Sequence, residues 1–211
     1  ARIMAGEKLA DLHLPADDRE FDYFCVKEAV MPFGRFPGSD VVLGPEMKST
    51  GEVMGIAGNF PAAFTKTQLA IDYEPPRGGE VFISVNDGDK RNITAIARSI
   101  ARLGFSLVAT TGTARALRAS GIECEEVGKI HAGSHTILDR IASGEIVLMI
   151  NTPFGSSTNT DGYEMRAACV RHGVSYCTTL AGAQALIAGM EAVRETGLDV
   201  IALQDLPQWE G

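Results

Sequence analysis

The 211-residue sequence has no apolar run that approaches the roughly 20 residues needed to span a bilayer. It also lacks a basic-then-apolar segment at its start, so it shows no secretory signal. Basic residues are in the minority, with 19 Lys and Arg against 27 Asp and Glu, and both halves of the chain share the acidic excess. This balance argues against nucleic-acid binding. We therefore expect a soluble, cytoplasmic protein that binds neither membranes nor nucleic acids.

Cysteine is scarce, and none of the 4 cysteines belongs to a C-x-x-C pair. Three of them lie in apolar stretches, which is typical of reduced, mostly buried thiols in a cytosolic protein. Cys177 is followed by two threonines, but no His or Asp accompanies it, which argues against a nucleophile. His131 and His135 are four residues apart without an H-E-x-x-H motif, and the Gly-Ser pair between them indicates a loop. We predict no metal site.

A linker rich in proline and glycine, Y-E-P-P-R-G-G at residues 73–79, divides the chain. Beyond it, short apolar runs alternate with helical patterns. The predicted strands cover residues 81–85, 105–109, 122–127, 146–150, 174–177 and 200–203, and the predicted helices cover 90–103, 113–120, 135–141, 162–172 and 181–195. Strands alternating with helices predict an α/β fold with a parallel, doubly wound sheet covered on both faces.

The first 72 residues are less regular. Residues 21–31 are strand-like and residues 61–70 form a short helical pattern, with a stretch dense in Gly and Pro between them. Such a segment has little core of its own. We expect it to be an α+β edge fragment of a larger domain, in a chain cut from a longer protein.

Polar residues gather where the predicted strands end and the next helices begin. In a parallel sheet these loops share one edge, and helix N-termini there attract anions. Each loop alone has a plain interpretation: T-T-G-T as a helix cap and tight turn, a lysine as a solvated charge, N-T-P as a turn. Their shared edge favours a phosphate or carboxylate site. The candidates are Lys90, Thr110, Thr111, Thr113, Lys129, His131, Asn151 and Thr152.

Two glycine motifs are absent from these loops: G-x-G-x-x-G and the P-loop. Neither NAD nor a Walker-type ATP site is therefore predicted. Asp161 and Glu164, near the start of a predicted helix, are interpreted as capping residues rather than as an acid and a base.

Residues 26–55 read V-K-E-A-V-M-P-F-G-R-F-P-G-S-D-V-V-L-G-P-E-M-K-S-T-G-E-V-M-G and closely resemble the tail of the second ATP-grasp unit of carbamoyl-phosphate synthetase. The later stretches S-V-N-D-G-D-K, A-T-T-G-T-A and I-N-T-P-F-G resemble that family's C-terminal domain, which has a methylglyoxal-synthase-like fold. The resemblance implies an ATP-grasp remnant at residues 1–72, a linker at 73–79 and a methylglyoxal-synthase-like allosteric domain at 80–211.

In this family the large chain works with a glutaminase small chain to make carbamoyl phosphate for pyrimidine and arginine biosynthesis. The residues that hold ATP and Mg²⁺ in the parent precede the part present here. The resemblance therefore implies a fragment without a cofactor of its own that is catalytically inactive alone. Its expected partners are the rest of the large chain, the small chain and effectors: UMP as inhibitor, IMP and ornithine as activators.

The resemblance also assigns roles to individual residues. Those that match nucleotide-phosphate positions are Lys90, Thr110, Thr113, Lys129 and Asn151; those that match IMP contacts are His131 and Asp161; those that match ornithine positions are Glu28 and Thr178. Pro153 and Ser156 replace a hydroxyl residue and an arginine of the family pattern, which weakens the expectation for IMP. Cys177 stands where an acidic residue is common, which weakens the expectation for ornithine.

Two other functions remain open. The same fold makes methylglyoxal from dihydroxyacetone phosphate, but the synthases carry G-G-D-Q-Q where residues 132–136 read A-G-S-H-T, so Ser134 replaces the carboxylate base. The other alternative is a structural docking domain that stabilises homo-oligomers.

Overall fold

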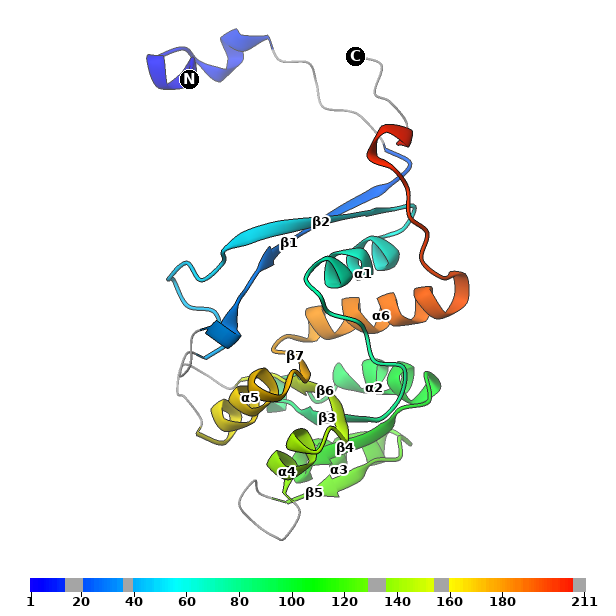
Figure 1. The fold of residues 1–211 in the computed structure, drawn as a ribbon. Helices are drawn as coiled ribbons and strands as arrows, with labels where there is room; N and C mark the ends of the chain where they lie inside the picture. The colour runs from blue at the N-terminus through cyan, green and yellow to red at the C-terminus, as the bar shows by residue number, and fades with distance from the viewer. Residues whose placement is uncertain (14–20, 36–39, 129–135, 154–159, 207–211) are drawn as a thin grey trace.

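The computed structural model describes residues 1–13, 21–35, 40–128, 136–153 and 160–206. Its larger part is built on a five-stranded parallel sheet with the strand order β5-β4-β3-β6-β7 (Figure 1). The strands are β3 Glu80–Ser84, β4 Ser106–Thr110, β5 Glu125–Val127, β6 Ile146–Asn151 and β7 Ser175–Cys177. The central strands β3 and β6 are apolar and buried on both faces, as expected for strands that helices cover from both sides.

The helices divide between the two faces of this sheet. They are α2 Ile93–Arg102, α3 Thr111–Ala119, α4 Ile137–Ala142, α5 Thr160–His172 and α6 Leu180–Thr196. On one face Val81 and Ile83 of β3 pack with α2, α3 and α6, and on the other Phe82 packs with α4 and α5. Successive strand residues thus serve opposite cores. The predicted α/β fold with a parallel, doubly wound sheet is confirmed.

The smaller N-terminal unit is an antiparallel hairpin of β1 Phe24–Val30 and β2 Gly51–Ala57, backed by α1 Phe60–Ala70. Gly55 of β2 allows a close approach, because a Cβ there would lie 2.1 Å from the Ala63 carbonyl oxygen of α1. The other face of α1 packs on α6 (Figure 1). Gly189 of α6 serves that contact, since a Cβ at this position would lie 2.2 Å from Thr65 Oγ1.

One predicted strand is absent from the structure, and one observed strand was not predicted. Residues 200–203 form no strand; Val200 is fully exposed, and a 3₁₀ turn follows at Leu203–Asp205. This segment runs back along the N-terminal unit, where Asp199 pairs with Lys66 at 3.0 Å (Figure 1). Strand β2 was missed, because its glycines and exposed positions hide the strand pattern.

The cysteines are less buried than predicted. All 4 are free thiols, but Cys169 alone is fully buried, whereas Cys124 and Cys177 are partly buried and Cys25 is exposed. Within the described ranges, no helix has the length and apolar character needed to cross a membrane.

Candidate anion-binding site

A cavity of about 360 Å³ lies at the carboxyl end of the sheet, where β3, β4 and β6 end. Hydroxyl, amide, carboxylate and glycine residues line it: Ser84, Thr110, Thr111, Gly112, Gly128, Asn151, Asp161 and Gly162. Its floor is apolar, with Phe82 and Met165 among the lining residues. The structure therefore brings together four of the predicted residues, Thr110, Thr111, Asn151 and Asp161, at the predicted edge.

The turn from β4 into α3 leaves backbone donors at the cavity. Thr110 occupies the N-cap position of α3, but its side chain does not cap the helix. Its hydroxyl instead lies 3.3 Å from Thr113 Oγ1 and 3.4 Å from Ser84 Oγ. The first N–H groups of a helix have no partner within the helix, so those of Thr111 and Gly112 remain available to an anion.

Lys90 stands directly over this helix start. A Cβ at Gly112 would lie 2.8 Å from Lys90 Nζ, so the ammonium contacts the backbone of the first turn of α3. Lys90 also pairs with Asp87 at 2.5 Å and retains 29% side-chain exposure. A cation and the positive end of a helix dipole side by side both favour the same bound anion.

Asn151 supplies a fixed amide on the opposite side of the cavity. It is 6% exposed, donates from Nδ2 to the Ser84 carbonyl at 3.1 Å and accepts at Oδ1 from Arg166 Nη1 at 2.7 Å. An amide nitrogen carries two N–H groups. One is used on Ser84, and the second is available to a ligand.

Two of the predicted ligands, Thr113 and Thr152, make hydrogen bonds within the protein. Thr113 is 1% exposed, and its hydroxyl accepts from the Val85 amide at 3.3 Å. The Thr152 hydroxyl accepts from both the backbone and side-chain nitrogens of Asn86 at 3.0 Å. Thr152 thereby supports the short turn Asp87–Asp89 that carries Lys90. Neither residue lines the cavity, and Lys90 does not line it either but lies beside Gly112, which does.

Two further predicted ligands, Lys129 and His131, lie outside the described residues. Among the described ones, no group of three or more His, Cys, Asp or Glu side chains is placed to hold a metal ion.

The sequence interpretation missed Ser84, Gly162 and Arg166. Ser84 ends a predicted strand, so its position at the edge could have been recognised from the same rule that selected Asn151. Gly162 lies under Arg166, since a Cβ there would be 2.9 Å from Arg166 Nη1. Arg166 is an arginine within a helix, and nothing in the sequence pattern separates it from an exposed one.

The predicted ornithine residues Glu28 and Thr178 meet in a second cavity of about 760 Å³ between the two units. Glu28 Oε2 accepts from Thr67 Oγ1 at 2.6 Å and from Gln68 Nε2. Burial, and then the charge of Glu28, raise the pKa of Cys177 in this cavity to about 12. Burial likewise raises the pKa of Tyr73 to about 12. Glu28 is the acidic residue among the described residues that line this cavity.

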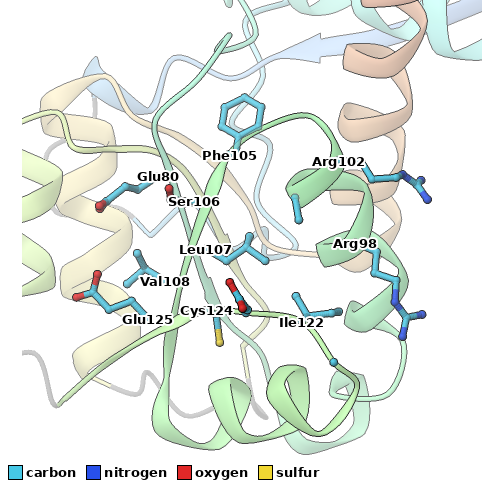
Figure 2. A pocket seen from close by; sticks show the side chains of 13 residues that line it. Glu80, Arg98, Arg102, Phe105, Ser106, Leu107, Val108, Ile122, Cys124 and Glu125 are labelled. Atoms are coloured by element: carbon cyan, nitrogen blue, oxygen red, sulfur yellow. The ribbon is translucent and has the colours of Figure 1, made fainter.

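A further cavity, of about 850 Å³, lies at the amino end of the strands beside α2 (Figure 2). Four of its charged groups, Glu80, Arg98, Arg102 and Glu125, are already engaged within the protein. Glu80 pairs with Arg140, and Arg98 donates to the Ser120 carbonyl at 2.9 Å. Figure 2 shows Arg98 and Arg102 pointing away from Glu80 and Glu125. Because its donors do not converge and no sheet-covering helix begins there, we place the candidate site at the carboxyl end of the sheet.

Comparison with known proteins gives a consistent result. Residues 92–178 match the MGS-like domain family. The C-terminal section of the carbamoyl phosphate synthase large chain of Methanopyrus kandleri is 50% identical over 201 residues, 95% of this chain and 37% of that protein. The carbamoyl phosphate synthase large chain of Myxococcus xanthus is 45% identical over 205 residues, 97% of this chain and 19% of that protein.

Among solved structures, methylglyoxal synthase from Elizabethkingia anophelis NUHP1 matches with a TM-score of 0.45 and 17% identity, over 53% of this chain and 78% of that one. The chain spans about a fifth of the length of the full large chain it matches.

Proposed function

Because the chain carries an MGS-like domain and is similar along almost its whole length to the C-terminal part of carbamoyl phosphate synthase large chains, we propose that it is the regulatory end of such a chain. Its cavity at the carboxyl end of the sheet holds the phosphate of a nucleotide effector such as UMP. The observation that carries this proposal is that the first turn of α3 and Asn151 line one cavity, with Lys90 Nζ beside Gly112 of that turn.

The two sides of the cavity differ in charge, as the phosphate and the ribose of a nucleotide require. The donors of α3 and Lys90 lie on one side, and Asp161, in the first turn of α5, lies on the other. A carboxylate repels a phosphate but accepts hydrogen bonds from sugar hydroxyls. The phosphate therefore sits over α3, and the ribose extends toward Asp161, the position that the family pattern assigns to an IMP contact.

The second cavity takes a cationic effector of the ornithine type. Glu28 offers a carboxylate at neutral pH, and Thr178 offers a hydroxyl. Cys177, where the family often has an acid, stays neutral because its pKa is raised to about 12. A cation therefore pairs here with one carboxylate of this chain.

The activity of the whole protein is part of the same proposal. In the parent, the large chain and its glutaminase partner make carbamoyl phosphate from bicarbonate, glutamine and ATP in the cytoplasm, for pyrimidine and arginine synthesis. This chain regulates that reaction and does not itself bind ATP and Mg²⁺, so alone it forms no carbamoyl phosphate.

A thermal-unfolding screen with UMP, UTP, IMP, ornithine and acetylglutamate tests the proposal. A ligand at 100 times its dissociation constant stabilises a folded protein by about 2.7 kcal/mol. For a chain of this size that is a rise in Tm of roughly 5–10 °C. We expect a saturable rise with UMP. If the chain is folded and no nucleotide changes its Tm, the regulatory proposal is wrong and a structural docking role is favoured.

A further inference from the structure

Arg166 connects the candidate anion site with the N-terminal unit. Its side chain is 5% exposed and lies on α5, at the base of the cavity rim. Nη1 donates to Asn151 Oδ1 at 2.7 Å, while Nε and Nη2 donate to the two carboxylate oxygens of Asp40 at 2.8 and 2.6 Å. One guanidinium thus joins a cavity residue to a residue 126 positions earlier in the sequence.

The contact with Arg166 determines which way the Asn151 amide faces. A guanidinium has five N–H donors and no acceptor, so it can hold only the oxygen of the amide. With Oδ1 fixed on Arg166, Nδ2 turns toward the Ser84 carbonyl and the cavity. Arg166 therefore keeps Asn151 oriented as a donor, the orientation that an anion requires.

The contact with Asp40 holds Arg166 in place and neutralises it. A buried cation without a partner is strongly unfavourable, and the two-pronged pair with Asp40 removes that cost. Burial raises the pKa of Asp40, but hydrogen bonds from Arg166 and the Val42 amide outweigh burial and hold the pKa below its usual value. The Val42 amide donates to Asp40 Oδ1 at 3.2 Å, and Lys48 Nζ donates to the backbone carbonyl of Asp40 at 3.4 Å. Both contacts fix Asp40 within the segment that leads into β2.

We propose that Arg166 is a positioning residue that couples phosphate binding at the sheet edge to the docking of residues 40–42 on α5. This rests on the proposed function of the cavity. Asp40 holds Arg166, Arg166 orients Asn151, and Asn151 donates to the phosphate. Coupling between two sites is reciprocal, so bound phosphate also strengthens the contact between Arg166 and Asp40.

The first test separates this relay from simple charge attraction. Removing an acidic residue near an anion site should strengthen anion binding if only long-range charge matters. The relay gives the opposite sign for Asp40→Ala: UMP binding, measured by calorimetry, weakens at least about fivefold, the lower end of typical coupling between sites. Glu46→Ala is the matched control, because Glu46 is an exposed acid of the same segment. Equal or tighter UMP binding by Asp40→Ala than by Glu46→Ala overturns the relay.

The second test measures whether UMP binding changes the backbone next to Asp40. Saturating UMP should slow amide hydrogen exchange at Val41 and Val42 in the wild-type chain. Arg166→Lys keeps the charge but not the planar fork that contacts Asp40 and Asn151 together. In this variant, saturated with UMP, the added protection of Val41 and Val42 should be lost. Protection that persists in Arg166→Lys, or that never appears in the wild type, contradicts the relay.

A ligand-free measurement keeps the relay testable if UMP fails to bind the wild-type chain, a result that would refute the proposed nucleotide site. In Asp40→Ala the freed Arg166 should release the Asn151 amide, which shifts the Asn151 side-chain N–H signals in a ¹H–¹⁵N spectrum. The signals should stay in place in Glu46→Ala. Unchanged Asn151 signals in Asp40→Ala overturn the relay independently of any nucleotide.

Discussion

Lys90 is the cationic side chain that lies beside the first turn of α3 at the candidate anion site. Its ammonium contacts the first turn of α3, and its pair with Asp87 is solvent-exposed on the Asp87 side, which is 87% accessible. Hydrogen bonds to charged groups contribute roughly 1.5–3 kcal/mol. Lys90→Ala should therefore weaken UMP binding about tenfold to a hundredfold in a calorimetric titration. Exposed ion pairs contribute little to stability, so Tm without ligand should hardly change.

Arg98→Ala is the matched control for Lys90→Ala. Arg98 carries the same charge but lies within α2 beside the large cavity at the other end of the sheet. UMP affinity should be unchanged in this variant. Equal small losses at both positions would mean diffuse charge attraction rather than a defined site.

The thiol of Cys177 should be inert despite its place in the second cavity. Its pKa is raised to about 12, so at pH 8 only on the order of 10⁻⁴ of it is thiolate, the reactive form. Cys25 is exposed. Iodoacetamide at pH 8, followed by mass spectrometry, should modify Cys25 first and Cys177 far more slowly, and Cys25→Ser should remove the fast phase. Modification of both at the same rate would mean that the cavity is open to solvent.

At the residue scale, the sequence could predict positions but not pairings. The carboxyl-end rule correctly placed Thr110, Thr111 and Asn151 at one edge, because strand ends can be recognised from apolar runs; Asp161 came from the family resemblance alone. It could not tell that the Thr113 hydroxyl is turned to the Val85 amide. It also could not find the contact of Arg166 with Asp40, because no periodicity relates residues so far apart in sequence.

At the scale of elements, the packing of α6 on α1 joins the two units and depends on Gly189. A methyl group there would lie 2.2 Å from Thr65 Oγ1, inside any allowed contact, so the helices must separate or distort. Overpacking of this kind costs about 1–3 kcal/mol. Gly189→Ala should lower the free energy of unfolding in urea by about that amount.

The same contact predicts a rescue. The Cβ of Thr65 would lie 3.6 Å from the added methyl group, an ordinary contact distance. Adding Thr65→Ala to Gly189→Ala should therefore recover stability, with a departure from additivity of about 1 kcal/mol or more. Strictly additive losses would show that the interface absorbs the methyl group elsewhere.

Strands that are buried along their whole length were predicted well, whereas the partly exposed strand β2 and the exposed residues 200–203 were not. The apolar runs of β3 and β6 and the alternation with helices identified the sheet. Strand β2 was missed because its burial pattern is uneven, with Gly51 and Gly55 among its seven residues. The apolar residues 200–203 were assigned to a strand. A strand also needs a neighbouring strand to pair with, and an apolar run does not show whether one lies beside it. Val200 is instead fully exposed.

At the scale of the whole molecule, both candidate effector cavities are connected to the N-terminal unit. The sheet-edge cavity lies within the MGS-like domain, the Glu28 cavity lies between the two units, and Arg166 joins the first to Asp40. In the proposed function, effector occupancy is communicated through the contacts of the N-terminal unit with the rest of the parent chain.

The location of nucleotide binding is the central claim, and a ¹H–¹⁵N NMR titration of the chain with UMP tests it most directly. We predict saturable shifts concentrated at the backbone amides of Thr111 and Gly112 and at the Asn151 side-chain amide, around the 360 Å³ cavity at the carboxyl end of the sheet. Shifts that cluster instead at Arg98 and Ser106, around the 850 Å³ cavity of Figure 2, would contradict the account.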